Sequence, residues 1–223
     1  MAESHILVAQ DTVNAAGENT WTAAKGSKMG YQVVMDFYTQ MAIEGRAFQV
    51  RAGTVATGLA ADSTLTDTAA NMCVDAASGT TIIPVSIRLG LRDVATGTTL
   101  QCAMKAVGAV SSAGTAFVPL PLLQGGVASV ATARVATDGG VTVTAELATT
   151  TRRLWEFEAL QTQSATVLAV GSLATIASAA WRPIVPYIGV GPACVYVQIA
   201  STTAFTLHFG ALDFIELPTT AIS

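Results

Sequence analysis

The stretch "CVYVQIASTTAFTLHFGALDFIELP", residues 194–218, indicates the fold class more clearly than any other part of the chain. Two runs of alternating apolar residues flank a Ser-Thr-Thr turn, and alternation with period two is typical of β-strands with one buried face. The residues predicted to share the buried faces are Val195, Val197 and Ile199 before the turn, and Phe205, Leu207 and Phe209 after it. We therefore expect a closing β-hairpin of a sandwich.

The second run changes phase after Gly210, because Leu212 and Phe214 alternate out of step with Phe209. A β-bulge at Gly210–Ala211 would explain the change, and so would a strand buried on both faces. No Lys or Arg occurs between residues 194 and 218. We expect the outer face of the hairpin to contact a neighbouring subunit.

The composition of the whole chain points to self-association. Of 223 residues, 12% are charged and 51% are hydrophobic, whereas an ordinary soluble domain has about 25% charged residues. A surface so poor in charge is either covered by other subunits or coated with small neutral residues such as Thr, Ser, Ala and Gly. We expect both.

The charges and cysteines exclude several classes of partner. The net charge is -4, and no Lys/Arg cluster exists beyond Arg152–Arg153, so no direct nucleic-acid binding is expected. Cys73, Cys102 and Cys194 are odd in number and far apart, which favours reduced core residues of a protein made in a cytosol.

Two further segments bear on location. The start "MAESHILVAQD" lacks the basic and apolar regions of a secretory signal. Residues 159–181 escape charge, but Gln161, Gln163 and many Ser, Thr and Gly residues make a membrane span an unfavoured interpretation.

The chain divides into an N-terminal arm, residues 1–28, and a single domain, residues 29–223. The arm has no regular period, and Trp21 is its one large apolar anchor. Residues 30–45 fit both a strand and an amphipathic helix, and their β-branched and aromatic content favours a strand or bent strand.

Strand patterns then follow one another along the chain. They lie at residues 46–54, 80–91, 98–108, 140–149 and 152–160. In the last, Trp155 and Phe157 should point inward and Glu156 and Glu158 outward. Roughly seven to nine strands without βαβ alternation predict an all-β sandwich or barrel. Residues 55–79 form the longest connection, which we expect to be an interface or functional loop.

Candidate chemical groups are few. His5 and His208 are the only histidines, and His208, in a strand opposite Leu207 and Phe209, should be exposed or lie in an interface. Glu156 and Glu158 stand about 7 Å apart on one strand face. That spacing fits paired-carboxylate glycoside chemistry on paper, but a solvated face neutralised by Arg152 and Arg153 is favoured.

Asp62, Asp67 and Asp75 could surround a calcium ion, although their spacing matches no known loop motif and solvation by water is favoured. Motifs for phosphate binding, dinucleotide binding, nucleophilic serine and zinc are absent from the sequence. We therefore expect no enzyme, no catalytic or metal-binding residue, no cofactor and no small-molecule substrate.

Three stretches carry a resemblance to a known family. They are "FYTQMAIEGRAFQVRAGTV" (37–55), "DAASGTTIIPVSIRLGL" (75–91) and "WRPIVPYIGVGPACVYVQIASTTAFTLHFGALDFIELP" (181–218). The first two are similar to the entry of the jelly-roll domain in capsid proteins of icosahedral bacterial and archaeal viruses. The third resembles the closing strands of such a domain, with a Pro-rich ledge before a hairpin. Together they cover about half the chain.

The resemblance implies a single jelly-roll β-sandwich and a structural virion protein, a shell subunit that self-assembles through low-charge interfaces. Its partners would be copies of itself and other virion proteins of a bacteriophage or related virus, and it would be made in the host cytoplasm and located in the virion. The arm has only Lys25 and Lys28 as cations, so the subunit would not neutralise the genome. A capsid lined by a membrane or another protein layer, or filled by a motor, would fit better.

The alternative is a binding module, either a trimeric jelly-roll fibre head or a carbohydrate-binding sandwich. Such a module would display a row of exposed aromatic residues. The large aromatics mostly lie within strand patterns instead, and the candidates are Trp21, Trp155, Trp181, Tyr187 and Tyr196.

Overall fold

The structure is a computed structural model, and it confirms the all-β class. It describes residues 36–54, 56–92, 99–137, 139–145, 151–160, 178–202 and 207–221. These residues form antiparallel sheets with one short helix, α1 (Phe37–Ile43), and a final 3-10 turn, η1 (Thr219–Ala221). The predicted arm, with Trp21 and His5, lies outside the described residues. The single jelly roll stays a prediction.

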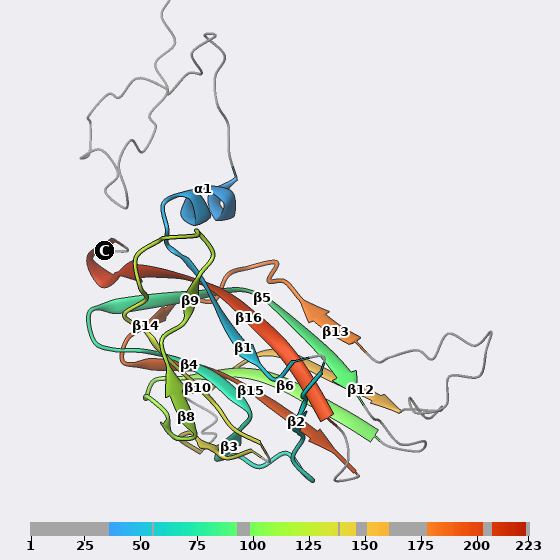
Figure 1. Ribbon diagram of the computed structural model, residues 1–223. Helices are drawn as coiled ribbons and strands as arrows, with labels where there is room; N and C mark the ends of the chain where they lie inside the picture. The colour runs from blue at the N-terminus through green and yellow to red at the C-terminus, as the bar shows by residue number, and fades with distance from the viewer. Residues whose placement is uncertain are drawn as a thin grey trace, which may run out of the picture.

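Two large sheets face each other (Figure 1). The first has the order β13 (Ser178–Trp181), β5 (Thr80–Arg92), β16 (Leu207–Pro218), β1 (Ala47–Ala52) and β9 (Leu120–Pro121), with β14 (Gly189–Val190) added on β5 and β2 (Leu59–Ala60) on β16. The second has the order β12 (Arg152–Leu160), β6 (Thr99–Val107), β15 (Ala193–Ser201), β4 (Met72–Ala76), β10 (Thr132–Val135) and β8 (Thr115–Phe117).

The strands pair in a nested order. The first strand, β1, pairs with the last, β16. Moving inward along the chain, β4 pairs with β15, β5 with β13, and β6 with β12. A single long hairpin, β1–β4–β5–β6 running back through β12–β13–β15–β16, would give these pairs if it were rolled up. The segment between β6 and β12 is an insertion that supplies β7 to β11.

The main core lies between the two sheets. Alternate residues of both sheets meet there, as expected for facing sheets, and Val50, Met104, Val197 and Phe214 are almost fully buried. The rings of Phe48 and Phe214 have centroids 5.8 Å apart. Trp155 and Phe157 pack against this core while Glu156 and Glu158 are exposed, as the alternation predicted.

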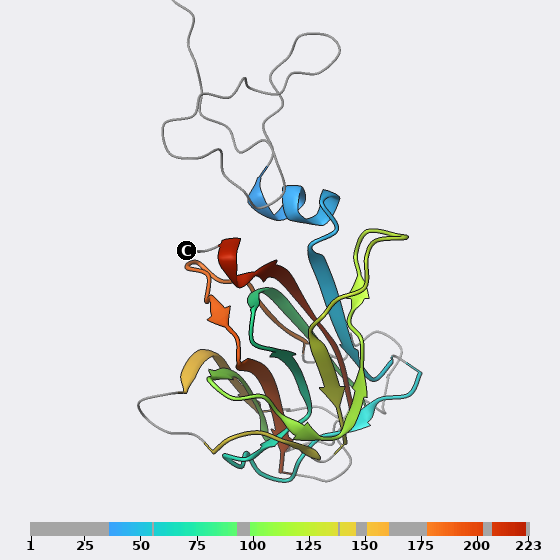
Figure 2. The same cartoon turned by 90° about the vertical axis from the view of Figure 1, so that its left-hand side faces the viewer.

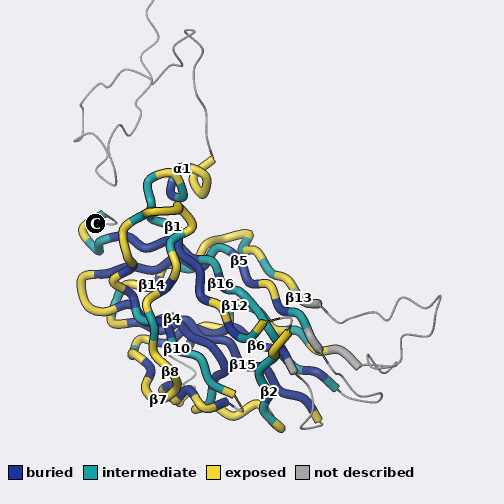
Figure 3. Tube along the Cα trace, in the orientation of Figure 1, coloured by how far each residue is buried: buried dark blue, intermediate teal, exposed yellow. Residues whose placement is uncertain are grey.

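A small third sheet covers the outer face of the second sheet. Its order is β3 (Ala69–Ala70), β11 (Val141–Thr142) and β7 (Ser112–Ala113). A separate apolar cluster lies between these layers, around Tyr196, Val107 and Val141. The middle of the second sheet is therefore buried on both faces, which Figure 3 shows as continuous dark blue.

The predicted closing hairpin is wrong, although both of its strands exist. β15 pairs with β4 and β6 in the second sheet, whereas β16 pairs with β1, β5 and β2 in the first. The connection between them crosses from one sheet to the other. Every residue of β15 is buried, so its outer face is not available to a neighbouring subunit. The alternation was read correctly, but it does not report which strands pair.

The change of phase in β16 arises because part of the strand is buried on both faces, and not from a β-bulge at Gly210–Ala211. Leu212, Phe214, Ile215 and Leu217 are all buried, so the end of the strand is covered on both faces. β16 keeps an unbroken register against β1. The irregularity lies in β5, where the register against β16 steps from Ser86 to Pro84.

Pro84 is tolerated in a central strand because of that irregularity. On the other side of β5, β14 pairs only up to Ile82 and β13 only from Ile87. A proline removes a backbone donor and is found at bulges and unpaired edges. Pro84 lies in the gap between the two neighbouring strands, where a missing N–H removes no ladder bond.

Residues 37–43 are a helix, so the expectation of a strand over 30–45 is wrong where the structure describes it. The Asp36 carboxylate caps the helix by accepting bonds from the N–H groups of Tyr38 and Thr39, at 3.0 and 3.1 Å. Gly45, with φ +71°, ends it, and the next N–H, of Arg46, bonds the Met41 carbonyl at 2.8 Å. This is a Schellman-type termination.

The helix closes the outer face of the first sheet at one end. Met41 is buried against Ile83, Ile215 and Leu217, residues that point away from the main core. The helix therefore explains why the end of β16 is buried on both faces.

The expected long connection over residues 55–79 is also wrong. It contains β2, β3 and the whole of β4, a central strand of the second sheet. β4 was missed because both of its faces are buried, with Cys73 and Asp75 on the outer one, so it lacks an apolar/polar alternation. Of the strand predicted at 140–149, only Val141 and Thr142 form a strand, β11, among the described residues, and residues 146–150 lie outside them.

Candidate functional site

Exposed apolar side chains gather at one end of the sandwich. Among the described residues, fifteen large apolar side chains are exposed, and thirteen of them lie in three segments. We call these segments the apolar end: residues 37–43, 118–130 and 184–190. Figures 1 and 2 show α1, the loop after β9 and the segment between β13 and β14 at the same end. Exposed apolar side chains gathered in this way are typical of interaction sites, so the apolar end is the candidate functional site.

The most exposed side chains of the apolar end belong to Ile184 and Val185, at 102% and 80% of full exposure. They stand between Pro183 and Pro186 in "RPIVP", residues 182–186, which we call the proline loop. Proline fixes its own φ and restricts the residue before it to extended conformations. The two apolar side chains are therefore presented on a stiff loop.

A groove of about 350 Å³ lies on the other side of α1. Its walls include Glu44 and Gly45 at the end of the helix, Phe48 of β1, Val127 and Val130 of the insertion, and Leu217 of β16. We call it the α1 groove. Val127 and Val130 are 81% and 68% exposed, so the apolar wall faces solvent.

A buried carboxylate holds the insertion against this groove. Glu216 of β16 is 6% exposed, and it accepts a bond from the Ser129 hydroxyl and from the N–H groups of Val130 and Ala131, at 3.1 and 3.0 Å for the latter two. Charge-assisted bonds of this kind are among the stronger ones in proteins. The groove wall is therefore fixed to the central strand of the first sheet.

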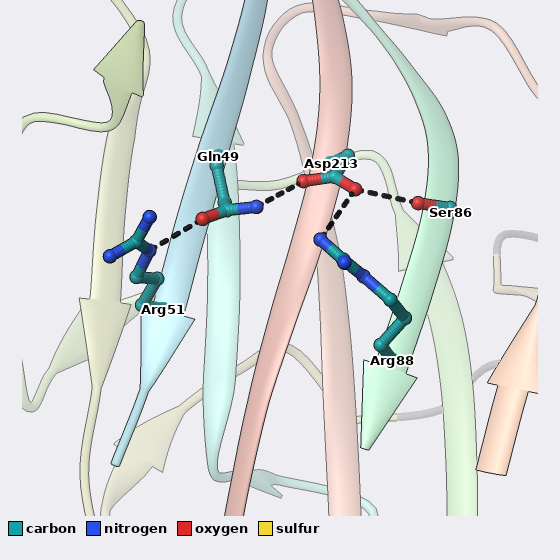
Figure 4. Close-up of polar contacts among 5 residues, drawn as sticks. All are labelled: Gln49, Arg51, Ser86, Arg88 and Asp213. Carbon is teal, nitrogen blue, oxygen red and sulfur yellow. Dashed lines mark hydrogen bonds and ion pairs between the residues drawn. The ribbon is translucent and has the colours of Figure 1, made fainter. Parts of the chain in front are cut away.

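The outer face of the first sheet carries a polar network (Figure 4). Asp213 of β16 accepts bonds from Gln49 at 2.6 Å and Ser86 at 2.7 Å, and its carboxylate lies 3.3 Å from the Arg88 guanidinium. Arg51 donates to Gln49 in turn. Four side chains from the neighbouring strands β1 and β5 bond to Asp213 of β16 or to its partner Gln49, so the network ties the three strands together across the sheet.

A second polar cluster lies under the third sheet, with Asp75 and Ser111 buried and Arg134 partly buried. Asp75 accepts bonds from the Ser111 N–H at 2.9 Å and its hydroxyl at 2.6 Å, and it pairs with Arg134 at 3.6 Å. Cys73 Sγ lies 3.0 Å from the Ser111 hydroxyl, and Cys194 stands on the neighbouring strand. Two thiols and one carboxylate place their donor atoms within 4.8 Å of one another.

These ligand types could suit a soft divalent metal, but their bonding does not favour one. The carboxylate of Asp75 is already engaged by Ser111 and Arg134. A hydrogen bond with Cys73, and then burial, raise the pKa of Cys194 well above its ordinary value, whereas metal binding requires thiolates. The cluster is best described as a structural one that holds the insertion against β4 and β15.

The three cysteines are free and buried, as predicted. Burial raises the pKa of Cys102, in the main core, to about 12. His208, expected to be exposed or in an interface, is completely buried. It shares a parity with Leu212 in β16 and so faces inward, which makes the expectation of an exposed histidine wrong.

The candidate carboxylates remain dispersed. Glu156 pairs with Arg153 at 3.4 Å on an exposed strand face, and Glu158 accepts a bond from Gln101. This is the solvated, neutralised arrangement that the sequence favoured. Asp62 is half-buried, Asp67 is exposed and Asp75 is buried in β4. The structure places no third ligand with any two of these aspartates among the described residues.

Comparisons with protein families, with curated proteins and with solved structures find no match for this chain. Among the described residues, no helix is both long and apolar enough to cross a membrane; residues 161–177 of the charge-free stretch lie outside them. The architecture and the apolar end are therefore the features that bear on function. Sequence reasoning missed this site because its side chains lie in loops and a short helix, where no periodicity shows them. Its one visible signal is the pair of apolar residues between prolines in "RPIVP".

Proposed function

We propose that this protein is a structural shell subunit of a virion, a single jelly roll that works by self-assembly. The observation that carries the proposal is the apolar end. Ile184 is fully exposed and Val185 and Val127 are 80% and 81% exposed, on a protein with half the usual share of charged residues. Neighbouring copies would bury this surface, and symmetry would multiply modest contacts into a closed assembly.

The strand pairing supports the jelly-roll part of the proposal. In a jelly roll, eight strands form two Greek keys in two sheets. The nested pairs β1 with β16, β4 with β15, β5 with β13 and β6 with β12 are the pairs that such a rolled hairpin makes. The sequence resemblance to capsid proteins of icosahedral bacterial and archaeal viruses is consistent with this order.

The remaining parts of the proposal follow from the same function. The partners are further copies of the chain and other virion proteins, and the subunit does not bind the genome itself. Its location is the virion after synthesis in the host cytoplasm, and an internal membrane or second protein layer is compatible with it.

The alternative, a fibre head or carbohydrate-binding module, has weaker support. Among the described residues, Phe37 and Tyr38 of α1 are the exposed aromatics. Their rings meet edge to face at a centroid distance of 5.7 Å, so they do not form a flat row of sugar-binding platforms. Trp155 and Phe157 are partly buried and stack on each other against the main core.

The test is the assembly state of the purified chain. Sedimentation velocity over a range of concentrations, followed by electron microscopy, should give capsomer-sized oligomers or closed particles. A chain that remains monomeric at every concentration and salt, alone and with co-expressed virion proteins, would refute the proposal. Specific binding on a glycan array by such a monomer would favour the carbohydrate-binding module.

A further inference from the structure

We propose that copies of this chain join head to tail, with the proline loop (residues 182–186) of one copy seated in the α1 groove of the next. The inference rests on the proposed self-assembly and specifies the contact that drives it. The partner is a second copy of the same chain, and the two surfaces that meet are different.

The proline loop has the properties of an inserting element. Ile184 and Val185 are adjacent and fully or nearly fully exposed, so insertion would remove the largest apolar area that the loop can offer. Pro183 and Pro186 restrict the backbone of the loop, which bends at Ile184 and Val185, before it binds. A preorganised segment loses little conformational entropy on association, so more of the burial contributes to affinity.

The α1 groove has the properties of a receiving site. Its volume of about 350 Å³ is at the small end of the range of pockets that bind ligands, ~300 to 1,000 Å³. Phe48, Val127, Val130 and Leu217 give it apolar walls. Because Glu216 anchors residues 129–131, these walls are already in place before a partner arrives.

The charges of the two surfaces are complementary. Arg182 is the one charged residue of the proline loop. The groove contains Glu44, Arg46 and Glu216, which sum to -1, and the Glu216 carboxylate is already satisfied by the insertion. Gln40 donates to one oxygen of Glu44 at 2.8 Å, and the other oxygen, Oε2, is buried and has no hydrogen-bond partner among the described residues. The net negative charge of the groove, rather than a free oxygen of Glu44, would therefore attract the arginine of a neighbour.

The proline loop of a copy lies too far from the α1 groove of the same copy to fill it. Arg182 and Pro183 lie beside Asp36 and Tyr38, at the start of α1, whereas the groove begins at Glu44, at its end. Figure 2 shows the loop after β9 and the segment between β13 and β14 on opposite sides of the apolar end. A contact between two different surfaces is heterologous, and such contacts generate rings when the rotation closes.

The decisive experiment uses two variants that each remove one surface. The loop variant is Ile184→Asp/Val185→Asp, and the groove variant is Val127→Asp/Val130→Asp. All four side chains are exposed, so both variants should fold, with unchanged circular dichroism. Leu65→Asp, an exposed apolar residue outside the apolar end, is the control and should assemble like the wild type.

Each variant alone should be monomeric in native mass spectrometry. An equimolar mixture, with one variant isotopically labelled, should give one-to-one heterodimers and nothing larger, because only one intact loop and one intact groove remain. Variants that assemble like the wild type, or a mixture that stays monomeric while the wild type assembles, would overturn the head-to-tail contact alone. A monomeric wild type would instead refute the proposed function on which the inference rests.

Charge reversal tests the polar part of the contact. Arg182→Glu and Glu44→Arg should each weaken self-association by about tenfold or more, because each places like charges together. Combining the two substitutions in one chain should restore assembly toward the wild-type level. If the double variant is as weak as the product of the single ones, Arg182 and Glu44 do not meet.

Discussion

Two outer surfaces of this sandwich differ in what covers them. The outer face of the second sheet is covered by the chain itself, through β3, β7 and β11. Polar side chains under this cover bond to the backbone: Gln198 donates to the Ala69 carbonyl at 2.7 Å, and Asn71 accepts from the Ile199 N–H at 2.7 Å. The apolar end has no such cover from the described residues, and Ile184 and Val185 are exposed there.

The difference shows which surface the fold completes by itself. Where the insertion lies over the second sheet, the apolar side chains are buried within one chain, although Asn71 Nδ2 and Gln198 Oε1 have no hydrogen-bond partner among the described residues. At the apolar end, large apolar side chains remain in solvent, which is the condition that association relieves. Removing groups from the covered surface should therefore change folding stability, whereas removing them from the apolar end should change assembly.

The largest effect on stability is expected at Asp75. Asp75→Ala would leave the buried Ser111 donors and Arg134 without their acceptor, and we expect a loss of about 3 kcal/mol in the free energy of unfolding. Urea denaturation of the monomeric chain measures it. Asp67→Ala, at an exposed aspartate of the same segment, is the control and should stay within about 0.5 kcal/mol of the wild type. Equal losses of stability in the two variants would show that the Asp75 cluster does not stabilise the fold.

A smaller effect on stability is expected within α1, which has one buried and one exposed apolar residue to compare. Met41 is buried against Ile215, whereas Ile43 is 57% exposed at the apolar end. Met41→Ala should reduce the free energy of unfolding by about 2 kcal/mol. Ile43→Ala should leave unfolding within about 0.5 kcal/mol. A greater loss for Ile43 in a monomeric sample would mean that the helix packs by its other face.

The smallest effect concerns the pH dependence of the core. The ordinary pKa of a thiol here is 9.0, and burial raises that of Cys102 to about 12. Between these values the unfolded chain loses the thiol proton while the folded chain keeps it. The contribution of Cys102 is therefore complete below pH 9 and is lost as the pH rises above it.

At about pH 10 the loss from Cys102 should be about 1.4 kcal/mol, one unit above the ordinary value. Urea denaturation at about pH 7 and pH 10 measures the change for the wild type and for Cys102→Ala. The variant should lose less stability over this interval by that amount. An identical decline in both proteins would show that Cys102 is ionised at a lower pH than its burial implies.

Much of the strand content could be predicted from the sequence. Alternation located β1, β5, β6, β12, β15 and β16, and it placed Trp155 and Phe157 inward. Pairing could not be predicted, because β15 is buried on both faces and its outer residues, Tyr196 among them, read as one more alternating face. β4 was missed for the same reason, since Ser111 and Val141, which help to cover its outer face, lie more than thirty positions away in the chain.

The helix and the apolar end were missed for local reasons. In α1, the capping residue Asp36 and the terminating Gly45 were the signals that could have identified a helix, and strand-forming composition outweighed them. In the apolar end, the exposed side chains are set by tertiary structure, because burial of a loop residue has no sequence period. The candidate carboxylates were resolved correctly as a solvated face, because Arg153 lies three residues before Glu156.

The central claim is that another copy covers the apolar end, and site-specific labelling tests it most directly. The native cysteines are all buried, so an engineered cysteine provides the reactive thiol. Val185→Cys should react rapidly with a maleimide in dilute monomer and at least about tenfold more slowly in the assembled protein, as occlusion of the site requires. Leu65→Cys, outside the apolar end, should react at the same rate in both states. Equal, rapid labelling of Val185→Cys in monomer and assembly would contradict the account.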